Sequence, residues 1–276
     1  QSSSSVSSSL ASAASESSSS QAGHPLQSQP QSVNDAQLQA ELAALVPDLF
    51  VVVAFSILPK PLLAVPRIGS VNLHPSLLPA YRGAAPIVWA IANGEQETGI
   101  STFLLDPRVD AGDILMQRRI AIAPDETAGQ LEARLCLLGA DMVLETVDSL
   151  ENGSLTPLPQ NRRGVTSAPK LSKEDGRIDW SQSAVLINNR IRGFNPFPGA
   201  FTTLAGQPLK VHRAQPTHGT GTPGQVIQAD ARNGLLVACG QGALSLKSVQ
   251  LPGKAPMETS AFLLGNPIAA GACLGG

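Results

Sequence analysis

One uninterrupted apolar run constrains the fold of this chain more than any other feature of its sequence. Residues 49–58 read LFVVVAFSIL, and Pro47 and Pro59 bracket them closely. So short a run between two prolines predicts a strand and not a buried helix, because proline ends helices. Since apolar residues occupy both faces, we expect a strand buried on both sides, as in a parallel sheet covered by helices.

The neighbouring segments extend this strand into an α/β pattern. In residues 35–45, leucines recur every three or four positions, which predicts a helix capped by Asn34 or Asp35. Residues 69–74 and 100–105 are short apolar runs typical of further strands. The order of helix and strands predicts a doubly wound, Rossmann-like α/β domain.

Helix signals continue beyond these strands. Pro86 suits the first turn of a helix and Gly94 suits its end, so we expect a helix over residues 86–93. A strand over 113–123 and a helix over 127–150 follow. The long helix begins with Thr127 and Gln130 at capping-box spacing.

Composition divides the chain into four parts. Residues 1–35 are rich in Ser, Ala and Gln and are predicted to be disordered. The α/β domain spans residues 36–153, and a connection rich in Pro, Ser and Arg over 154–180 reads as a linker. In residues 181–276, short β-rich runs recur about every ten residues, which predicts a small barrel or sandwich.

The cysteines and the leader bear on the cellular compartment. Cys136, Cys239 and Cys273 are few, odd in number and widely spaced, which indicates no disulfide framework, no zinc site and a reducing compartment. No apolar run reaches the length of about 20 residues that a membrane span needs, so we expect no membrane partner. The Ser-rich leader hints at a mitochondrion or plastid, although no arginine precedes Arg67; the bacterial cytoplasm is the alternative.

Three polar side chains stand at predicted strand ends. Asn72 and His74 are two apart on one strand, so their side chains project from the same face. Pro75 ends that strand, and Asp110 follows the strand over residues 100–105. If the two strands are parallel neighbours, an amide, an imidazole and a carboxylate meet in one crevice at their carboxyl ends.

At these residues the chain resembles a known family. N-L-H-P-S-L-L-P-A-Y-R-G-A-A-P at 72–86 and V-D-A-G-D at 109–113 resemble the folate-dependent formyltransferases, most of all those that act on methionyl-tRNA. The words at 168–180 and 191–201 match the same family. The resemblance implies transfer of the formyl group of 10-formyltetrahydrofolate to the amino group of initiator methionyl-tRNA, for translation initiation, by a monomer with an OB-like C-terminal barrel.

The resemblance also assigns roles to these side chains. Formyl transfer to an amine passes through a tetrahedral oxyanion, which preplaced donors must stabilise. The Asn72 amide and a protonated His74 would supply them, and Asp110 would favour the imidazolium and take a proton from the amine. The chemistry requires neither a metal nor a covalent nucleophile. The residues implied to bind folate are Phe55, Ile57, Leu58, Ser76, Leu77, Leu78 and Pro79.

The C-terminal region is basic. Residues 170–276 hold ten Lys or Arg against five Asp or Glu, which suits a surface facing nucleic acid. The residues predicted to bind tRNA are Arg82, Arg190, Arg192, Lys210, Arg213, Lys247 and Lys254.

Three departures from the family pattern keep alternatives open. Residues 54–59 are one residue shorter than the family's pterin-pocket word, and Arg108 stands where a glycine is usual. The resemblance begins near residue 36, without the family's first strands and its tRNA-reading loop. The alternatives are a glycinamide ribonucleotide or sugar-nucleotide formyltransferase, a formyltetrahydrofolate hydrolase domain, or an inactive fragment that binds tRNA.

Overall fold

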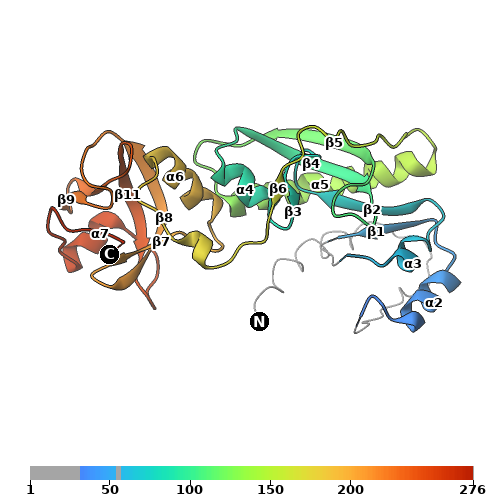
Figure 1. Cartoon of the computed structure of the whole chain (residues 1–276), viewed down its shortest axis with the longest axis horizontal. Coiled ribbons are helices and arrows are strands. Elements are labelled where there is room, and N and C mark those ends of the chain that lie inside the picture. The colour runs from blue at the N-terminus through green and yellow to red at the C-terminus, as the bar shows by residue number, and fades with distance from the viewer. Residues whose placement is uncertain (1–31, 54–56, 276) are drawn as a thin grey trace. The chain divides into compact units, whose positions relative to one another are not determined.

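The computed structural model describes residues 32–53 and 57–275 (Figure 1). Most of the segment predicted to be disordered, and Phe55, lie outside this description. The chain forms two compact units. Of the described residues, the first comprises 32–53, 57–84, 98–120 and 133–168, and the second comprises 85–97, 121–132 and 169–275. The domain boundaries read from composition stay a prediction.

The first unit is built on a four-stranded mixed sheet with the order β1-β2-β4-β5. β1 is parallel to β2, whereas β2 is antiparallel to β4. Hydrogen bonds from Leu104 to Asp113 and from Ile122 to Gln96 join the two ends of β4 and β5, so this pair is also antiparallel. The strands are β1 (Leu49–Val52), β2 (Gly69–His74), β4 (Glu97–Leu104) and β5 (Ile114–Ala121).

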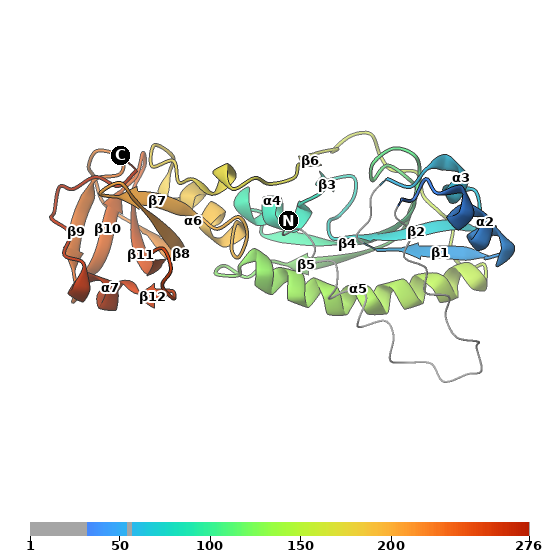
Figure 2. The ribbon, with the colours of Figure 1, turned by 90° about the horizontal axis from the view of Figure 1, so that it is seen from below.

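Helices accompany this sheet. α5 (Ala128–Glu151) runs along it (Figure 2), and the Thr146 hydroxyl lies 2.9 Å from that of Thr102 on β4. The predicted capping box is confirmed, because Thr127 N donates to Gln130 Oε1 at 2.9 Å. The remaining elements are α2 (Ala36–Ala44), α3 (Lys60–Leu63), and the short parallel pair β3 (Arg82–Gly83) and β6 (Ser167–Ala168).

Two expectations about this sheet are wrong. β1 ends at Val52, and Val51 is 48% exposed, so the strand is not buried on both faces. The reason is position, since within the described residues β1 is an edge strand that pairs with β2. β2 and β4 are not parallel either, so Asp110 reaches the end of β2 from the loop between β4 and β5.

The second unit is a curled antiparallel sheet with the order β7-β8-β11-β10-β9, to which β12 adds by pairing with β11. The β-rich runs expected at 209–212, 235–238 and 243–249 form longer strands (β8, β10 and β11), and the run expected at 224–229 forms the slightly shorter β9. The elements are α4 (Pro86–Ala92), α6 (Ala184–Gly193), β7 (Phe201–Leu204), β8 (Gln207–Thr217), β9 (Val226–Asp230), β10 (Gly234–Ala238), β11 (Ala243–Gln250), β12 (Met257–Glu258) and α7 (Thr259–Gly265).

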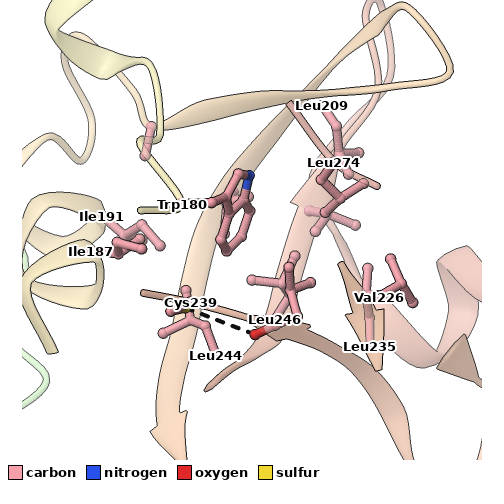
Figure 3. Close-up of a cluster of buried hydrophobic side chains, with 14 of the residues drawn as sticks. Trp180, Ile187, Ile191, Leu209, Val226, Leu235, Cys239, Leu244, Leu246 and Leu274 are labelled. Carbon is pink, nitrogen blue, oxygen red and sulfur yellow. Dashed lines mark hydrogen bonds between the residues drawn. The ribbon is translucent and has the colours of Figure 1, made fainter. Parts of the chain in front are cut away.

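Trp180 anchors the core of this unit (Figure 3). Its ring is buried among side chains of α6 and the sheet, and its Nε1 donates to Thr202 Oγ1 at 3.0 Å. Phe194 packs edge-on against Trp89 of α4, with ring centroids 6.0 Å apart. Phe197, in contrast, is 55% exposed.

Candidate active site

His74 ends β2 and is buried, with 5% of its surface exposed. Its ring stands edge-on to Phe103, with centroids 6.4 Å apart. Nε2 lies 2.9 Å from the carbonyl oxygen of Tyr81. A carbonyl only accepts, so Nε2 carries the hydrogen, and Nδ1 is the atom that faces the neighbouring carboxylate.

Asp110 supplies that carboxylate from the loop after β4. Its Oδ2 lies 3.8 Å from His74 Nδ1 and accepts the backbone N–H of Gly83 at 2.7 Å. The Asp110 backbone has φ of 49°, a left-handed conformation that non-glycine residues adopt rarely. The structure therefore brings His74 and Asp110 together.

Gly83 is fixed by its surroundings. Its φ is 121°, and a Cβ placed there would lie 2.6 Å from the carbonyl oxygen of Ala168 on β6. Only glycine fits so close an approach between two backbones. The glycine of the R-G-A-A-P word thus lets β3 pair with β6 and aims one N–H at Asp110.

Burial decides the charge of His74. Loss of solvent lowers the pKa of the imidazole below its ordinary value, and this outweighs the Asp110 carboxylate, which raises it. The nearby Arg82 guanidinium lowers the His74 pKa further. Burial and Arg82 thus favour the neutral ring, whereas the sequence led us to expect that Asp110 would favour the imidazolium.

Asn72 lies two residues before His74 on β2 and is half-buried. Its Nδ2 donates to the carbonyl oxygen of Val52, at the end of β1, at 2.7 Å. One of the two amide hydrogens is thus used to hold the side chain against the neighbouring strand. The amide is fixed in place before any substrate binds.

Two side chains that the sequence analysis did not identify bind the backbone of the S-L-L-P segment (residues 76–79). Ser101 Oγ donates to Ser76 O at 2.6 Å and accepts from Leu78 N at 3.1 Å. Gln117 Nε2 donates to Leu78 O at 2.9 Å. Ser76 and Leu78 are themselves buried, so they shape the loop backbone, whereas Leu77 and Pro79 are half-buried.

The other residues predicted to bind folate differ in exposure. Ile57 is 69% exposed and Leu58 is buried. Their role in binding folate stays a prediction. Among the described residues, no group of three or more His, Cys, Asp or Glu is placed to hold a metal ion.

The predicted tRNA-binding residues fall into both units. Arg82 lies in the first unit, where its Nη2 donates to Gln160 Oε1 at 2.6 Å. In the second unit, Arg213 Nη2 contacts both oxygens of Glu258 at 2.9 Å, and Arg192 donates to the Glu126 carbonyl at 3.0 Å.

The remaining basic residues of the second unit are less engaged. Lys210 and Lys254 are exposed, and Arg190 and Lys247 are half-buried. Lys210 pairs across the sheet with Gln250, whose Nε2 donates to the carbonyl of Lys254 at 2.6 Å. The two lysines therefore lie near the same ends of β8 and β11.

Gln160 is the functional candidate that no sequence signal indicated. Its Nε2 donates to the carbonyls of Asp110 at 2.9 Å and Gly112 at 2.7 Å. It lies 50 residues from Asp110 in a segment that reads as linker. Nothing in local periodicity connects two positions so far apart.

Comparisons with known proteins identify the family of this chain. A family model described as formyl transferase matches residues 3–147, and one described as formyl transferase, C-terminal domain, matches residues 170–267. The methionyl-tRNA formyltransferase of Trichlorobacter lovleyi is 47% identical over 247 residues, which cover 89% of this chain and 78% of the relative.

Solved structures show the same fold. The methionyl-tRNA formyltransferase from Clostridium thermocellum has a TM-score of 0.54 at 23% identity, over 66% of this chain and 78% of that one. HypX from Aquifex aeolicus in complex with tetrahydrofolic acid has a TM-score of 0.60 at 23% identity, over 82% of this chain and 40% of that one. The predicted α/β domain followed by a β domain is confirmed, and the chain belongs to the formyl transferase family.

Proposed function

We propose that this chain transfers the formyl group of 10-formyltetrahydrofolate to the amino group of initiator methionyl-tRNA. The observation that carries the proposal is the buried His74–Asp110 pair, with 3.8 Å between Nδ1 and Oδ2. His74 and Asp110 come from the two sequence motifs, 72–86 and 109–113, that resemble the family. The whole chain is 47% identical to a methionyl-tRNA formyltransferase.

His74 acts as a base at Nδ1. Its Nε2–H is committed to the Tyr81 carbonyl, so a neutral ring has its lone pair at Nδ1. The methionyl amine must lose a proton as it adds to the formyl carbon, and Nδ1 accepts it. The Asp110 carboxylate then stabilises the imidazolium, and His74 returns the proton to the folate nitrogen that leaves.

Asn72 stabilises the oxyanion that forms on the formyl oxygen. One N–H of its amide holds the Val52 carbonyl, and the second donates to the developing charge. A donor that is already oriented needs no reorganisation when the charge appears, which is the main source of such stabilisation. The folate itself lies against Ile57, Leu77 and Pro79 in this proposal.

The tRNA meets the basic residues that are free to bind phosphate. Lys210 and Lys254 are better placed to bind phosphate than Arg213, because the ion pair of Arg213 Nη2 with both oxygens of Glu258 must break first. Arg82, Arg190, Arg192 and Lys247 remain proposed contacts. We expect a monomer.

The cellular compartment is also a proposal. The relatives that the chain matches at about 47% identity are bacterial proteins, which supports the bacterial cytoplasm over a mitochondrion or plastid. Within residues 32–53 and 57–275, no helix is both long and apolar enough to cross a bilayer.

A competition assay tests the proposed acceptor. The chain is incubated with 10-formyltetrahydrofolate and either initiator methionyl-tRNA, glycinamide ribonucleotide or an amino-sugar nucleotide. We expect formylated methionyl-tRNA with the highest kcat/KM. Formylation of a small acceptor in its place would identify one of the alternative transferases, and release of formate without an acceptor would identify a hydrolase.

A further inference from the structure

Gln160 reaches the active-site loop from a distant segment of the chain. Its side chain makes three hydrogen bonds, all shorter than 3 Å, to the carbonyls of Asp110 and Gly112 and to the guanidinium of Arg82. All four residues belong to the first compact unit. Gln160 thus links the loop that bears Asp110 to the R-G-A-A-P segment.

The orientation of this amide is fixed by its partners. Two carbonyl oxygens can only accept hydrogen bonds, so they require the nitrogen of Gln160. The Arg82 guanidinium can only donate, so it requires the oxygen. The side chain therefore presents both amide hydrogens to one side and its carbonyl to the other, a pattern that neither Glu nor an apolar residue reproduces.

The loop that Gln160 holds has an unfavourable backbone. Asp110 has φ of 49°, and Gly112 has no room for a Cβ because the Leu104 carbonyl backs onto it. Such conformations persist only where surrounding contacts determine them. The Gln160 amide contacts the carbonyls of both Asp110 and Gly112, so it supports the part of the loop that sets the position of the carboxylate.

Arg82 is the second group that Gln160 controls. Its guanidinium lies close enough to His74 to lower the pKa of the imidazole, while Asp110 raises it. One amide thus holds both charged neighbours of the histidine. Its loss would change the charge environment of His74 as well as the geometry of the carboxylate.

We propose that Gln160 is a positioning residue for formyl transfer, which acts by holding Asp110 and Arg82 in place around His74. This inference rests on the proposed function for its kinetic consequence. Its structural consequence, an altered environment of the His74 imidazole, is measurable without any substrate.

The test is Gln160→Glu in the full chain. The carboxylate keeps an acceptor for Arg82, but it replaces Nε2, which donates to both carbonyls, with a single oxygen that can only accept. Displacement of catalytic groups by about 1 Å lowers rates by as much as about 100-fold, so we expect kcat to fall about 10- to 100-fold. The imidazole ¹⁵N signals of His74 should shift, because both charged neighbours of the ring lose their fixed positions.

Asn161→Asp is the matched control. It introduces the same charge one residue away, at an exposed side chain whose Oδ1 accepts from Arg163 N at 2.9 Å, a bond that aspartate keeps. This variant should retain the kcat and the His74 signals of the wild type. If Gln160→Glu does not fold, Gln160→Met replaces it, and failure of both to fold would overturn the proposal by making Gln160 a folding residue.

The outcomes separate this inference from the proposed function. Wild-type chain that formylates none of the acceptors contradicts the function, and the His74 signals then decide the role of Gln160 alone. Gln160→Glu with wild-type kcat and unshifted His74 signals overturns the positioning role, whatever the acceptor proves to be.

Discussion

At the scale of single residues, the state of His74 follows from two opposed effects. Burial lowers its pKa and the Asp110 carboxylate raises it, with burial the larger. Replacing Asp110 with Asn removes the favourable charge and leaves the burial, so the His74 pKa in Asp110→Asn should fall below its wild-type value. An NMR titration of the imidazole signals measures this shift, with His212 and His218 as internal controls in the same spectra.

The same balance affects stability. A histidine whose pKa is lowered in the folded state binds fewer protons than the unfolded chain does below a pH of about 6.5. The contribution of neutral His74 to the free energy of unfolding is therefore complete above that pH and is lost as the pH falls through the lowered folded pKa.

The NMR titration also has an outcome that would contradict the proposed pair. An unchanged His74 titration in Asp110→Asn would show that the 3.8 Å approach carries no interaction.

At the scale of elements, the pairing of β3 with β6 depends on one glycine. A Cβ at Gly83 would lie 2.6 Å from the Ala168 carbonyl, so Gly83→Ala must push the strands apart and move the N–H that binds Asp110. We expect a loss of about 1–3 kcal/mol in the free energy of unfolding, measured by denaturant titration, together with a lower kcat.

Gly153→Ala is the control for this change. Gly153 also has a positive φ, 70°, but a Cβ there meets nothing within 4 Å. It should lose stability through backbone strain and keep its kcat. Equal kcat values for the two variants would show that the position of the Gly83 N–H does not matter to the reaction.

The elements also show what a sequence can predict. The capping box at Thr127 and the proline start of α4 are local signals, and both helices begin where these signals indicate. The burial of residues 49–58 and the direction of β4 depend on what packs beside them, which local patterns do not contain. Likewise, Gln160 and Asp110 are 50 residues apart, so no local sequence pattern predicts their contact.

At the scale of the whole molecule, we expect the salt dependence of tRNA binding to come mainly from the exposed lysines Lys210 and Lys254. Each phosphate contact contributes about −0.7 to −0.9 to the slope of log K against log salt. Lys210→Gln and Lys254→Gln should each reduce this slope by about that amount in a binding titration over several salt concentrations. Arg213→Gln should change it less, because Glu258 already pairs with this guanidinium.

This prediction is tested by the ranking of the three variants. A salt slope that Arg213→Gln reduces as much as the lysine variants do would contradict the role of the Glu258 ion pair. If no variant changes the slope, the basic surface of residues 170–276 does not bind tRNA, and a small formyl acceptor is favoured.

The central claim is that His74, together with Asn72 and Asp110, carries the chemical step. Its most direct test is the single-turnover rate of formyl transfer from 10-formyltetrahydrofolate to initiator methionyl-tRNA by the wild-type chain and by Asn72→Ala and His74→Ala. Loss of a preplaced catalytic group of this kind costs about 10²–10³ in rate, so each variant should be slower by about that factor while its affinity for tRNA is unchanged. A variant that folds, binds tRNA and turns over at the wild-type rate would contradict the account at that residue.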